Sequence, residues 1–461
     1  MPIIKASQVN PNFEFKNMLA IERQRYLQLH PKSVELGKQA AQYFLYGVPM
    51  HWMNDWGTPA PLFVRQAHGA HFICADQIEY VDFCLGDTGA MFGHSPEPVS
   101  LALEQQARRG YTTMLPDMIT PQVGAALADQ FGLPIWQITT TATDANRFVL
   151  RWARAVTGRK KLLVFDGCYH GTVDDTLVDV EDGRTISRTS LLGQTIDLGI
   201  HTVAVDFNDL VAVERELASG NFACLLTEPA LTNCGMVPAQ PGFISSLREL
   251  TRRYGTLLAL DETHTISSGR GGWARNNGIS PDFIVVGKPI AGGLPAAAYG
   301  FSDELAARMQ AVKDAAPAGH SGIGTTLSGN MMSMTAILAT LTEVATPAAY
   351  THMLELADEL EDGLNATLQH HALRWCITRI GARLELQFCS TPPLNAREAR
   401  ISQTDELEQA IHLFLLNRGV LLTPFHNMML VCPATSRTDI RKLLDVFDDC
   451  LTTFKQDVQI S

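Results

Sequence analysis

Short, almost entirely apolar runs recur through the middle of the chain and restrict its fold more than any other feature. Five of them have the sequences KLLVF, HTVAV, ACLLTEP, TLLALDE and DFIVVGK. Segments with helical spacing of apolar residues lie between such runs, for example residues 145–156. Strands without polar alternation are typically buried on both faces, as parallel strands covered by helices are. The pattern therefore predicts an α/β fold with a mostly parallel central sheet.

The segments on either side of this region follow a different pattern. Residues up to about 42 are predicted to form one helical arm, and short β-like runs within residues 62–85 indicate a small antiparallel unit. After residue 330 a long helical stretch precedes β-like runs (LRWCITRI, LELQFC and VLLTP), a helix near 405–417 and a terminal helix from Thr438. We therefore predict an N-terminal arm and small-domain segment at 1–85, a large domain at 86–330 and a C-terminal small domain at 331–461.

The charge of the chain argues against two classes of partner. Lys and Arg total 36 against 48 Asp and Glu, giving a net charge of −12, and no basic cluster stands out. We therefore expect no binding to nucleic acid or to an anionic membrane. Charged residues make up only 18% of the chain, which is low for a globular protein. Either the core is unusually large, or another subunit covers part of the surface.

The cysteines and the N-terminal residues bear on localisation. The 9 cysteines are scattered and form no CxxC pair, which fits a reducing cytoplasm and predicts no zinc site. The first residues, MPIIKASQVNPNFEF, contain no apolar signal region, and no apolar run is long enough to span a membrane. We expect a cytoplasmic protein without a membrane span and without a bound metal.

Polar residues at the ends of the apolar runs are the candidates for chemistry, because ligands of α/β sheets bind at the carboxyl ends of strands. Asp261 and Lys288 end two such runs, and the segment TTTATD precedes a predicted helix. A lysine that forms a Schiff base, an acid that keeps a pyridine nitrogen protonated and a helix N-terminus for a phosphate together predict a pyridoxal phosphate site. Taken singly, the acid could be a helix cap, the lysine a solvated turn and the threonines ordinary capping residues.

The order of these motifs resembles the class III (subgroup II) aminotransferases of PLP fold type I, and within them the glutamate-1-semialdehyde aminomutase-like branch. The resemblance covers nearly the whole chain, and its motifs are TTATDANRFVLRWARAVTGR, FDGCYHG, LLTEPALTNCGMVP, ALDETHT, PDFIVVGKPIAGGLP and GTTLSGN. It implies a large domain with a mostly parallel sheet covered by helices, and a small α+β domain formed by N- and C-terminal segments. It also implies pyridoxal 5'-phosphate as the cofactor.

The resemblance assigns roles to individual residues. Lys288 corresponds to the Schiff-base lysine that shuttles a proton, Asp261 to the partner of the pyridine nitrogen, and Tyr169 to the aromatic side chain that stacks on the ring. Further positions fall where the family binds the cofactor: Ala142 and Thr143 at the phosphate, Asn233 near the ring hydroxyl, Glu228 in the EP motif, and Thr326 at the phosphate of a neighbouring subunit. The last contact implies a homodimer with shared sites. Tyr169 could instead be ordinary core, and Glu262 could cap or pair locally. His170 either orients its loop or acts in catalysis.

The sequence departs from the family pattern at two places around the cofactor. Thr141-Ala142-Thr143 stands where Ser-Gly-Thr is usual, and Ala adopts a positive φ less readily than Gly, so the turn could differ. Thr263 and His264 stand where an aliphatic residue and Gln or Met are usual. We expect Thr263 to pack on the ring face. His264 reaches either the ring hydroxyl or a neighbouring polar group, or it is a buried, satisfied histidine.

A third departure concerns the substrate. The N-terminal loop GVPMHWMNDWG contains no arginine, although relatives grip a carboxylate with one there. Its residues His51, Trp52, Met53 and Trp56 predict a broader, more apolar substrate pocket. Arg65, Arg383 or another residue could bind the carboxylate instead.

These features predict a ping-pong transaminase that moves an amino group from an amine or amino acid to an oxo acid such as pyruvate, through a Schiff base on Lys288. The alternative is a PLP-dependent isomerase, either an aminomutase of the glutamate-1-semialdehyde type or a racemase. A PLP-binding protein without activity is disfavoured, because Lys288 and Asp261 are both intact.

Overall fold

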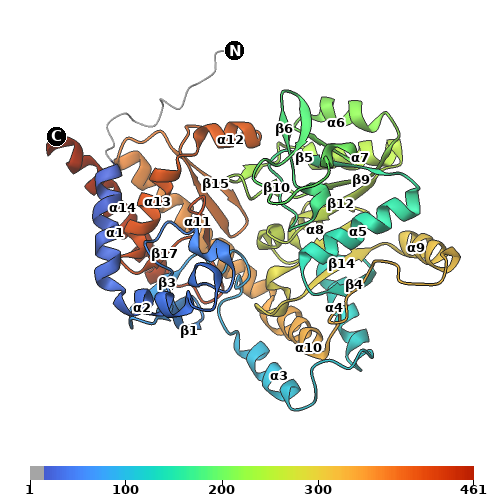
Figure 1. Cartoon of the computed structure of the whole chain (residues 1–461), viewed down its shortest axis with the longest axis horizontal. Helices are drawn as coiled ribbons and strands as arrows, with labels where there is room; N and C mark the ends of the chain where they lie inside the picture. Colours follow the sequence, from blue (N-terminus) through green and yellow to red (C-terminus); the bar gives the residue numbers. More distant parts are fainter. Residues whose placement is uncertain (1–14, 461) are drawn as a thin grey trace. The chain divides into compact units, whose positions relative to one another are not determined.

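The computed structural model describes residues 15–460, and the chain divides into two compact units (Figure 1). The large unit comprises Glu97–Tyr350 and Pro393–Arg400, and the described part of the small unit comprises residues 15–96, Thr351–Pro392 and 401–460. The domain limits expected from the sequence, at residues 85 and 330, stay a prediction. Residues 331–350 belong to the large unit because the helix that begins at Met331 packs on Glu97–Ala107 and on the segment Lys288–Ala291.

A seven-stranded sheet forms the centre of the large unit, in the order β4-β14-β13-β12-β9-β5-β8. Its strands are β4 (Ile135–Thr139), β5 (Lys161–Phe165), β8 (Thr202–Val205), β9 (Phe222–Thr227), β12 (Leu257–Asp261), β13 (Phe283–Val286) and β14 (Ala297–Phe301). The five strands from β13 to β8 run parallel, and β14 runs antiparallel to both of its neighbours. The predicted α/β fold with a mostly parallel sheet is confirmed.

Helices pack on this sheet. Helix α5 lies across β14, β13 and β9, and α7 packs on β12 (Figure 1). The helices of the large unit are α3 (Glu97–Ala107), α4 (Thr120–Phe131), α5 (Ala142–Thr157), α6 (Leu210–Leu217), α7 (Phe243–Tyr254), α8 (Gly272–Asn276), α9 (Asp303–Ala315) and α10 (Met331–Ala339). Short 3-10 helices are η3 (Asp174–Thr176), η4 (Leu198–Ile200), η5 (Thr265–Ser268) and η6 (Lys288–Ala291), and a π-helical turn is η7 (Thr340–Val344).

Some strands of the large unit gave no clear signal in the sequence. Strand β14 has the sequence AAYGF, in which Ala and Gly have low β propensity, yet all five residues are buried between β13 and β4. Two small hairpins also went unpredicted: β6 (Val178–Glu181) with β7 (Arg184–Ser187), and β10 (Ala230–Leu231) with β11 (Val237–Pro238). Tertiary burial, more than local propensity, determines β14, whereas most residues of β6 and β7 are half-buried or exposed.

The small unit is an α+β structure that combines N- and C-terminal segments. Strands β1 (Val64–His68), β2 (His71–Cys74) and β3 (Glu79–Asp82) form the expected antiparallel unit, and β17 (Val420–Leu421) adds to β3 in parallel. A second sheet contains β15 (Cys376–Ile380), β16 (Arg383–Gln387) and β18 (Met429–Leu430). Other elements are α1 (Phe15–Leu29), α2 (Pro31–Ala40), η1 (Leu45–Gly47), η2 (His51–Asn54), α11 (Pro347–His370), α12 (Ala396–Ser402), α13 (Asp405–Leu416) and α14 (Arg437–Ile460); α11 and α12 each begin in the large unit.

The predicted single helical arm is wrong in one respect, and its residues before 15 lie outside the described part. The arm is two helices, because α1 ends at Leu29 and α2 begins at Pro31. His30 between them has φ −122° and ψ 46°, which is not helical. A residue before proline is pushed away from the helical region, so the break follows from the His-Pro sequence. Within residues 15–460, every helix is too short or too polar to cross a lipid bilayer.

Candidate active site

Asp261 is the last residue of β12 and is buried. Its Oδ2 accepts hydrogen bonds from Nδ1 of His170 at 3.0 Å and from Nδ2 of Asn146 at 2.8 Å, and its Oδ1 accepts one from the backbone N–H of Thr263 at 3.1 Å. Burial alone would raise the pKa of Asp261, but these donors and the charge on His170 outweigh it and lower the pKa to about 2. The carboxylate is therefore ionised and can face a cation.

His170 supplies the positive charge of this pair. Its side chain is buried, and burial alone would lower its pKa. The hydrogen bond to Asp261 outweighs burial and raises the pKa of His170 to about 10. The sequence left open whether His170 orients its loop or acts in catalysis. The structure shows it as the charged partner of Asp261.

Lys288 lies on the neighbouring parallel strand end, directly after β13 and Gly287. It is half-buried, and Nζ donates a hydrogen bond to Nε2 of the buried His264 over 2.8 Å. Its φ of 47° is in the left-handed region, which a non-glycine residue adopts at a cost of about 1–3 kcal/mol. Of the alternatives for His264, the structure supports contact with a neighbouring polar group, the amine of Lys288.

The N-terminus of α5 lies close to the strand that leads to Lys288. A Cβ on Gly287 would lie 2.8 Å from Cβ of Ala142, so only glycine allows this approach. Thr141 is the N-cap, and its Oγ1 accepts a hydrogen bond from the backbone N–H of Asp144 at 3.1 Å. Ala142 is an ordinary first helical residue without positive φ among the described residues, so its replacement of glycine does not distort the turn.

Thr143, in the first turn of α5, is linked to the GCYHG segment. Its Oγ1 accepts a hydrogen bond from the backbone N–H of Thr172 at 3.2 Å. A Cβ on Gly171 (φ +78°) would lie 2.0 Å from that oxygen, so glycine is required there. Tyr169 in the same segment is 38% exposed, unlike its buried neighbours Cys168 and His170. Its ring is therefore accessible, which argues against the reading of Tyr169 as ordinary core.

Asn146 was missed by the sequence reasoning although it joins two parts of the site. It lies in α5 one turn after Ala142, is fully buried, and donates from Nδ2 both to Asp261 and to the carbonyl oxygen of His170 at 3.1 Å. The only signal was a polar residue on the apolar face of that helix, beside Ala145 and Phe148.

The other predicted residues of the large unit lie in different settings. Glu228 follows β9, is buried and accepts a hydrogen bond from the hydroxyl of Thr232, while Asn233 is half-buried. Thr263 is buried next to Asp261, and its Oγ1 has no hydrogen-bond partner among residues 15–460. Thr326 is exposed in the loop between α9 and α10. The roles of these residues stay predictions.

The residues expected to line the substrate pocket lie in the small unit. Trp52 and Met53 are in η2, where Trp52 is exposed, and Trp56 follows as a half-buried residue. Arg383 is fully buried within the small unit and donates from Nη1 to Oγ1 of Thr88 at 3.1 Å, so it is held by its own unit. The assignment of these residues to substrate stays a prediction.

Known proteins similar to this chain agree on the family. A model of the class III aminotransferase family matches residues 52–451. The crystal structure of a glutamate-1-semialdehyde-aminomutase from Pseudomonas aeruginosa PAO1 is similar, with a TM-score of 0.93. The two sequences are 47% identical, and the match covers 95% of this chain and 98% of the relative. A structure of a lysine-to-alanine variant of such an aminomutase from the same organism is in complex with PMP.

Two further relatives extend this picture. Glutamate-1-semialdehyde 2,1-aminomutase 2 of Brevibacillus brevis is 31% identical over 423 residues, which are 90% of this chain and 96% of the relative. A beta-phenylalanine aminotransferase from Variovorax paradoxus has a TM-score of 0.85 at 23% identity, over 95% of this chain and 98% of its own, which shows a shared fold alone.

The aminomutase relatives show that the transaminase prediction is wrong. Proteins 31–47% identical over most of the chain are isomerases, which supports the alternative stated from the sequence. The prediction relied on the missing arginine in GVPMHWMNDWG. A missing arginine bears on how a carboxylate is gripped, whereas it does not decide to which carbon the amino group is delivered. Lysine and acid serve the cofactor in both reaction classes, so these residues could not separate them.

The fold, the strand-end residues and the relatives all lead to one assignment. The sheet with its helices is that of PLP fold type I, and the family match spans most of the chain. The chain therefore belongs to the class III aminotransferase family, and its cofactor is pyridoxal 5'-phosphate.

Proposed function

We propose that the protein is a pyridoxal-phosphate-dependent aminomutase that moves the amino group of glutamate-1-semialdehyde between carbons 2 and 1 of the same molecule. The observation that carries this proposal is the likeness to aminomutases over most of the chain, at 31–47% identity. The reaction needs no second oxo acid, because the nitrogen returns to the skeleton from which it came.

The side chains around Lys288 fit the cofactor in charge and in shape. The N-terminus of α5, with Thr143 in its first turn, would hold the phosphate through backbone N–H groups. Ionised Asp261 would hold the protonated ring nitrogen, and the accessible ring of Tyr169 would cover one ring face. Thr263 supports the fit as well, because its buried hydroxyl has no hydrogen-bond partner within the described chain. Asn233 near the ring hydroxyl and Glu228 of the EP motif are proposed as cofactor-binding residues on the family resemblance alone.

Pyridoxal phosphate, when bound, supplies an aldehyde that reacts with primary amines and a ring that takes up electrons from a neighbouring carbon. The protein must keep the ring nitrogen protonated, and a carboxylate with a pKa of about 2 does so over the whole physiological range. His170 keeps this buried carboxylate charged, and Asn146 fixes its orientation. Asp261 is thus positioned by two side chains before any substrate binds.

Lys288 is proposed to remove a proton from one substrate carbon and to return it to the next. For that, Nζ must be held in one place and must be able to give up its own proton. Nε2 of His264, 2.8 Å away, accepts a hydrogen bond from the amine and so provides both the hold and a nearby proton acceptor. The left-handed backbone at Lys288 further restricts the directions in which its side chain can leave the strand end.

The protein is also proposed to be a homodimer in which Thr326 reaches the phosphate of the neighbouring subunit. In support, Thr326 is exposed, and large apolar side chains of the same unit are exposed as well: Tyr111, Met114, Leu115, Met118 and Leu327. An apolar surface of this kind is typical of an interface. Full activity at a concentration at which analytical ultracentrifugation finds only monomer would contradict the homodimer.

The function is tested by incubating the PLP-loaded enzyme with glutamate-1-semialdehyde and no amino acceptor. We expect the isomer with its amino group on carbon 1 and a keto group on carbon 2 to accumulate, with no nitrogen-free oxo acid released, as followed by NMR with ¹⁵N-labelled substrate. Lys288→Ala should abolish this turnover. Product that appears only when an oxo acid or a second amine is added would refute the aminomutase.

A further inference from the structure

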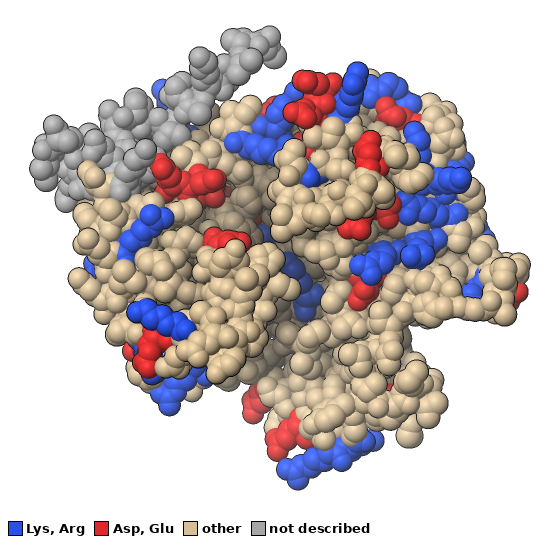
Figure 2. Space-filling model, in the orientation of Figure 1, with Lys and Arg blue, Asp and Glu red and all other residues tan. Residues whose placement is uncertain are grey.

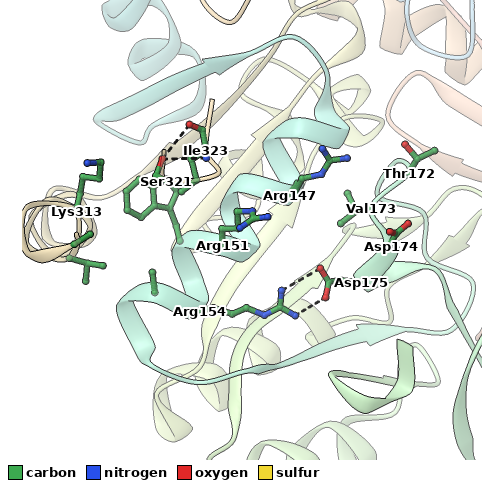
Figure 3. Close-up of a pocket in the computed structure, with 14 residues that line it drawn as sticks. Arg147, Arg151, Arg154, Thr172, Val173, Asp174, Asp175, Lys313, Ser321 and Ile323 are labelled. Atoms are coloured by element: carbon green, nitrogen blue, oxygen red, sulfur yellow. Dashed lines mark hydrogen bonds and ion pairs between the residues drawn. The ribbon is translucent and has the colours of Figure 1, made fainter. Parts of the chain in front are cut away.

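A basic pocket of about 640 Å³ lies in the large unit, on the side of α5 shown in Figure 3. It is formed by residues of α5, the segment 172–175, the end of α9 and the loop after it. Its lining residues are Arg147, Arg151, Trp152, Arg154, Ala155, Thr172, Val173, Asp174, Asp175, Val312, Lys313, Ala316, Ser321 and Ile323. A volume of this size accommodates a small organic ligand.

Three arginines of α5 give the pocket its charge. Arg147, Arg151 and Arg154 recur at helical spacing of four and three residues, so they lie on one side of the helix. Lys313, in the last turn of α9, adds a fourth cation. In Figure 2 basic side chains gather over the region of α5, although the chain as a whole carries a net charge of −12.

The acids of the pocket neutralise only part of this charge. Arg154 is engaged in a two-point pair with Asp175, at 2.7 and 3.3 Å, as Figure 3 shows. Arg147 has a loose ion pair with Asp144 at 3.8 Å. Arg151 and Lys313 have no ion pair with any residue in the described range. The lining thus carries four basic side chains against the two carboxylates of Asp174 and Asp175, a net charge of +2.

The remaining wall is apolar and fixed. Val173, Val312 and Ile323 line it together with Trp152. The indole N–H of Trp152 already donates to the hydroxyl of Tyr299 at 3.2 Å, so the ring contributes apolar surface to the pocket. An anionic group among the cations and an organic body along the apolar side chains would match these two kinds of surface.

We infer that this pocket binds an organic phosphate, whose dianionic group is held by Arg151, Lys313 and Arg147 and whose body lies along Trp152 and its apolar neighbours. Guanidinium groups bind phosphate oxygens in a two-point geometry, and the net charge of +2 of the lining matches the dianion of a phosphate monoester. The inference goes beyond the proposed function, since it does not depend on the reaction at Lys288.

The pocket is also connected to the proposed cofactor site. Thr172 lines the pocket, and its backbone N–H donates to Oγ1 of Thr143 in the first turn of α5. Arg147 lies one turn further along the same helix. A ligand that draws Arg147 and Thr172 together would therefore act on the turn that is proposed to hold the cofactor phosphate. We expect such a ligand to change the rate at which the cofactor dissociates.

The test is a titration of the PLP-loaded enzyme with phenyl phosphate, followed by isothermal calorimetry at low ionic strength. Because PLP fills the cofactor site, the probe reports on a second site. We expect saturable binding that phenol does not reproduce and that inorganic phosphate reproduces only weakly. The double variant Arg151→Gln, Lys313→Gln should bind phenyl phosphate with an affinity lower by about tenfold or more.

The matched control is Arg252→Gln, which removes one charge from an exposed arginine of α7. Each variant must keep the PLP absorbance and the unfolding temperature of the wild type. If the double variant does not, Arg151→Lys is tested in its place, because it keeps the charge and loses the two-point geometry. Equal affinity in wild type and variant would overturn the inference. So would an absence of binding to the wild type, including the case in which a second copy of the chain fills the pocket.

Discussion

Asp261 and Glu262 are neighbours at the end of β12 and both are buried, yet their hydrogen-bond partners differ in charge. Asp261 contacts a charged imidazole and an amide, His170 and Asn146, and its pKa is lowered to about 2. Glu262 accepts hydrogen bonds from the backbone N–H groups of Trp273 and Ala274, at the start of α8, and burial raises its pKa. One acid is kept charged by a cation, and the other is held by neutral donors.

This difference indicates which acid of the pair serves chemistry. A buried carboxylate that must face a protonated ring nitrogen needs a permanent charge, and only Asp261 has a cationic partner to maintain it. Glu262 stabilises the local structure, because its donors are the hydroxyl of Thr265 and the backbone N–H groups at the start of a short helix. The sequence Asp-Glu alone does not show which acid serves the cofactor, whereas the hydrogen-bond partners in the structure distinguish the two.

The largest expected effect comes from neutralising Asp261. In Asp261→Asn the side chain keeps its size, but it accepts hydrogen bonds through only one oxygen and loses the charge that faces the ring nitrogen. We expect kcat to fall by about 10²–10³-fold, by analogy with the loss of one preorganised electrostatic contact at a reacting centre. Steady-state kinetics and the absorbance of bound PLP measure the effect.

The control for that variant is Asp314→Asn, which neutralises an exposed acid in α9. It should leave kcat and the PLP spectrum unchanged. Full activity in Asp261→Asn would show that the charge of Asp261 is dispensable, and the contrast with Glu262 would then have no functional meaning.

Glu262→Gln should have the opposite profile. The amide can accept from only one oxygen, so the N–H of Trp273 or Ala274 loses its partner in a buried place. We expect the free energy of unfolding to fall by about 1–3 kcal/mol while kcat stays within about twofold of the wild type. Urea unfolding and kinetics on the same preparation measure both, with the exposed Glu304→Gln as the control. A large loss of kcat at unchanged stability would assign Glu262 to the chemistry as well.

The pH dependence of stability tests the charge on His170. Its pKa is about 10 in the folded protein against 6.5 for a free imidazole, so its stabilising contribution is complete below pH 6.5 and is lost as the pH rises toward 10. We expect the stability difference between wild type and His170→Gln to shrink over that interval. The partner acid titrates far below it, since the pKa of Asp261 is lowered to about 2 from 3.8. A difference that stays constant from pH 6 to pH 10 would mean that His170 is neutral.

The sequence predicts a good part of this architecture and of the cofactor site. Apolar runs such as KLLVF and TLLALDE are parallel strands, and Asp261 and Lys288 do end neighbouring strands, as expected from the packing of α/β sheets. Strand β14 and the break at His30 needed the structure, since burial between two strands overrides weak propensity and a single Pro divides a helical pattern.

The reaction class and the partners of Asp261 were out of reach of the sequence for a different reason. Asn146 is 115 residues away from Asp261 along the chain, and a buried asparagine in a helix has no local signal of its role. The prediction of a transaminase gave too much weight to one missing arginine. Both reaction classes use the same lysine and acid, so a single sequence could not decide between them.

The smallest expected effect concerns His264, which accepts a single hydrogen bond from the amine of Lys288. In His264→Gln, the amide oxygen can still accept a hydrogen bond from Nζ, although it cannot take up the proton. We therefore expect KM to change little and kcat to fall by about five- to tenfold, the loss of roughly one hydrogen bond to a charged group.

The pH profile distinguishes a proton acceptor from a purely structural contact. If His264 takes part in proton movement at Nζ, one ionisation should disappear from the dependence of kcat on pH in His264→Gln, while the exposed control His201→Gln keeps it. A readout without turnover is the pH titration of the bound-PLP absorbance, which should shift in His264→Gln because the amine of Lys288 has lost an imidazole neighbour. Unshifted titration together with an unchanged kcat profile would reduce His264 to a packing residue and leave Asp261 and His170 as the charged partners on which the site depends.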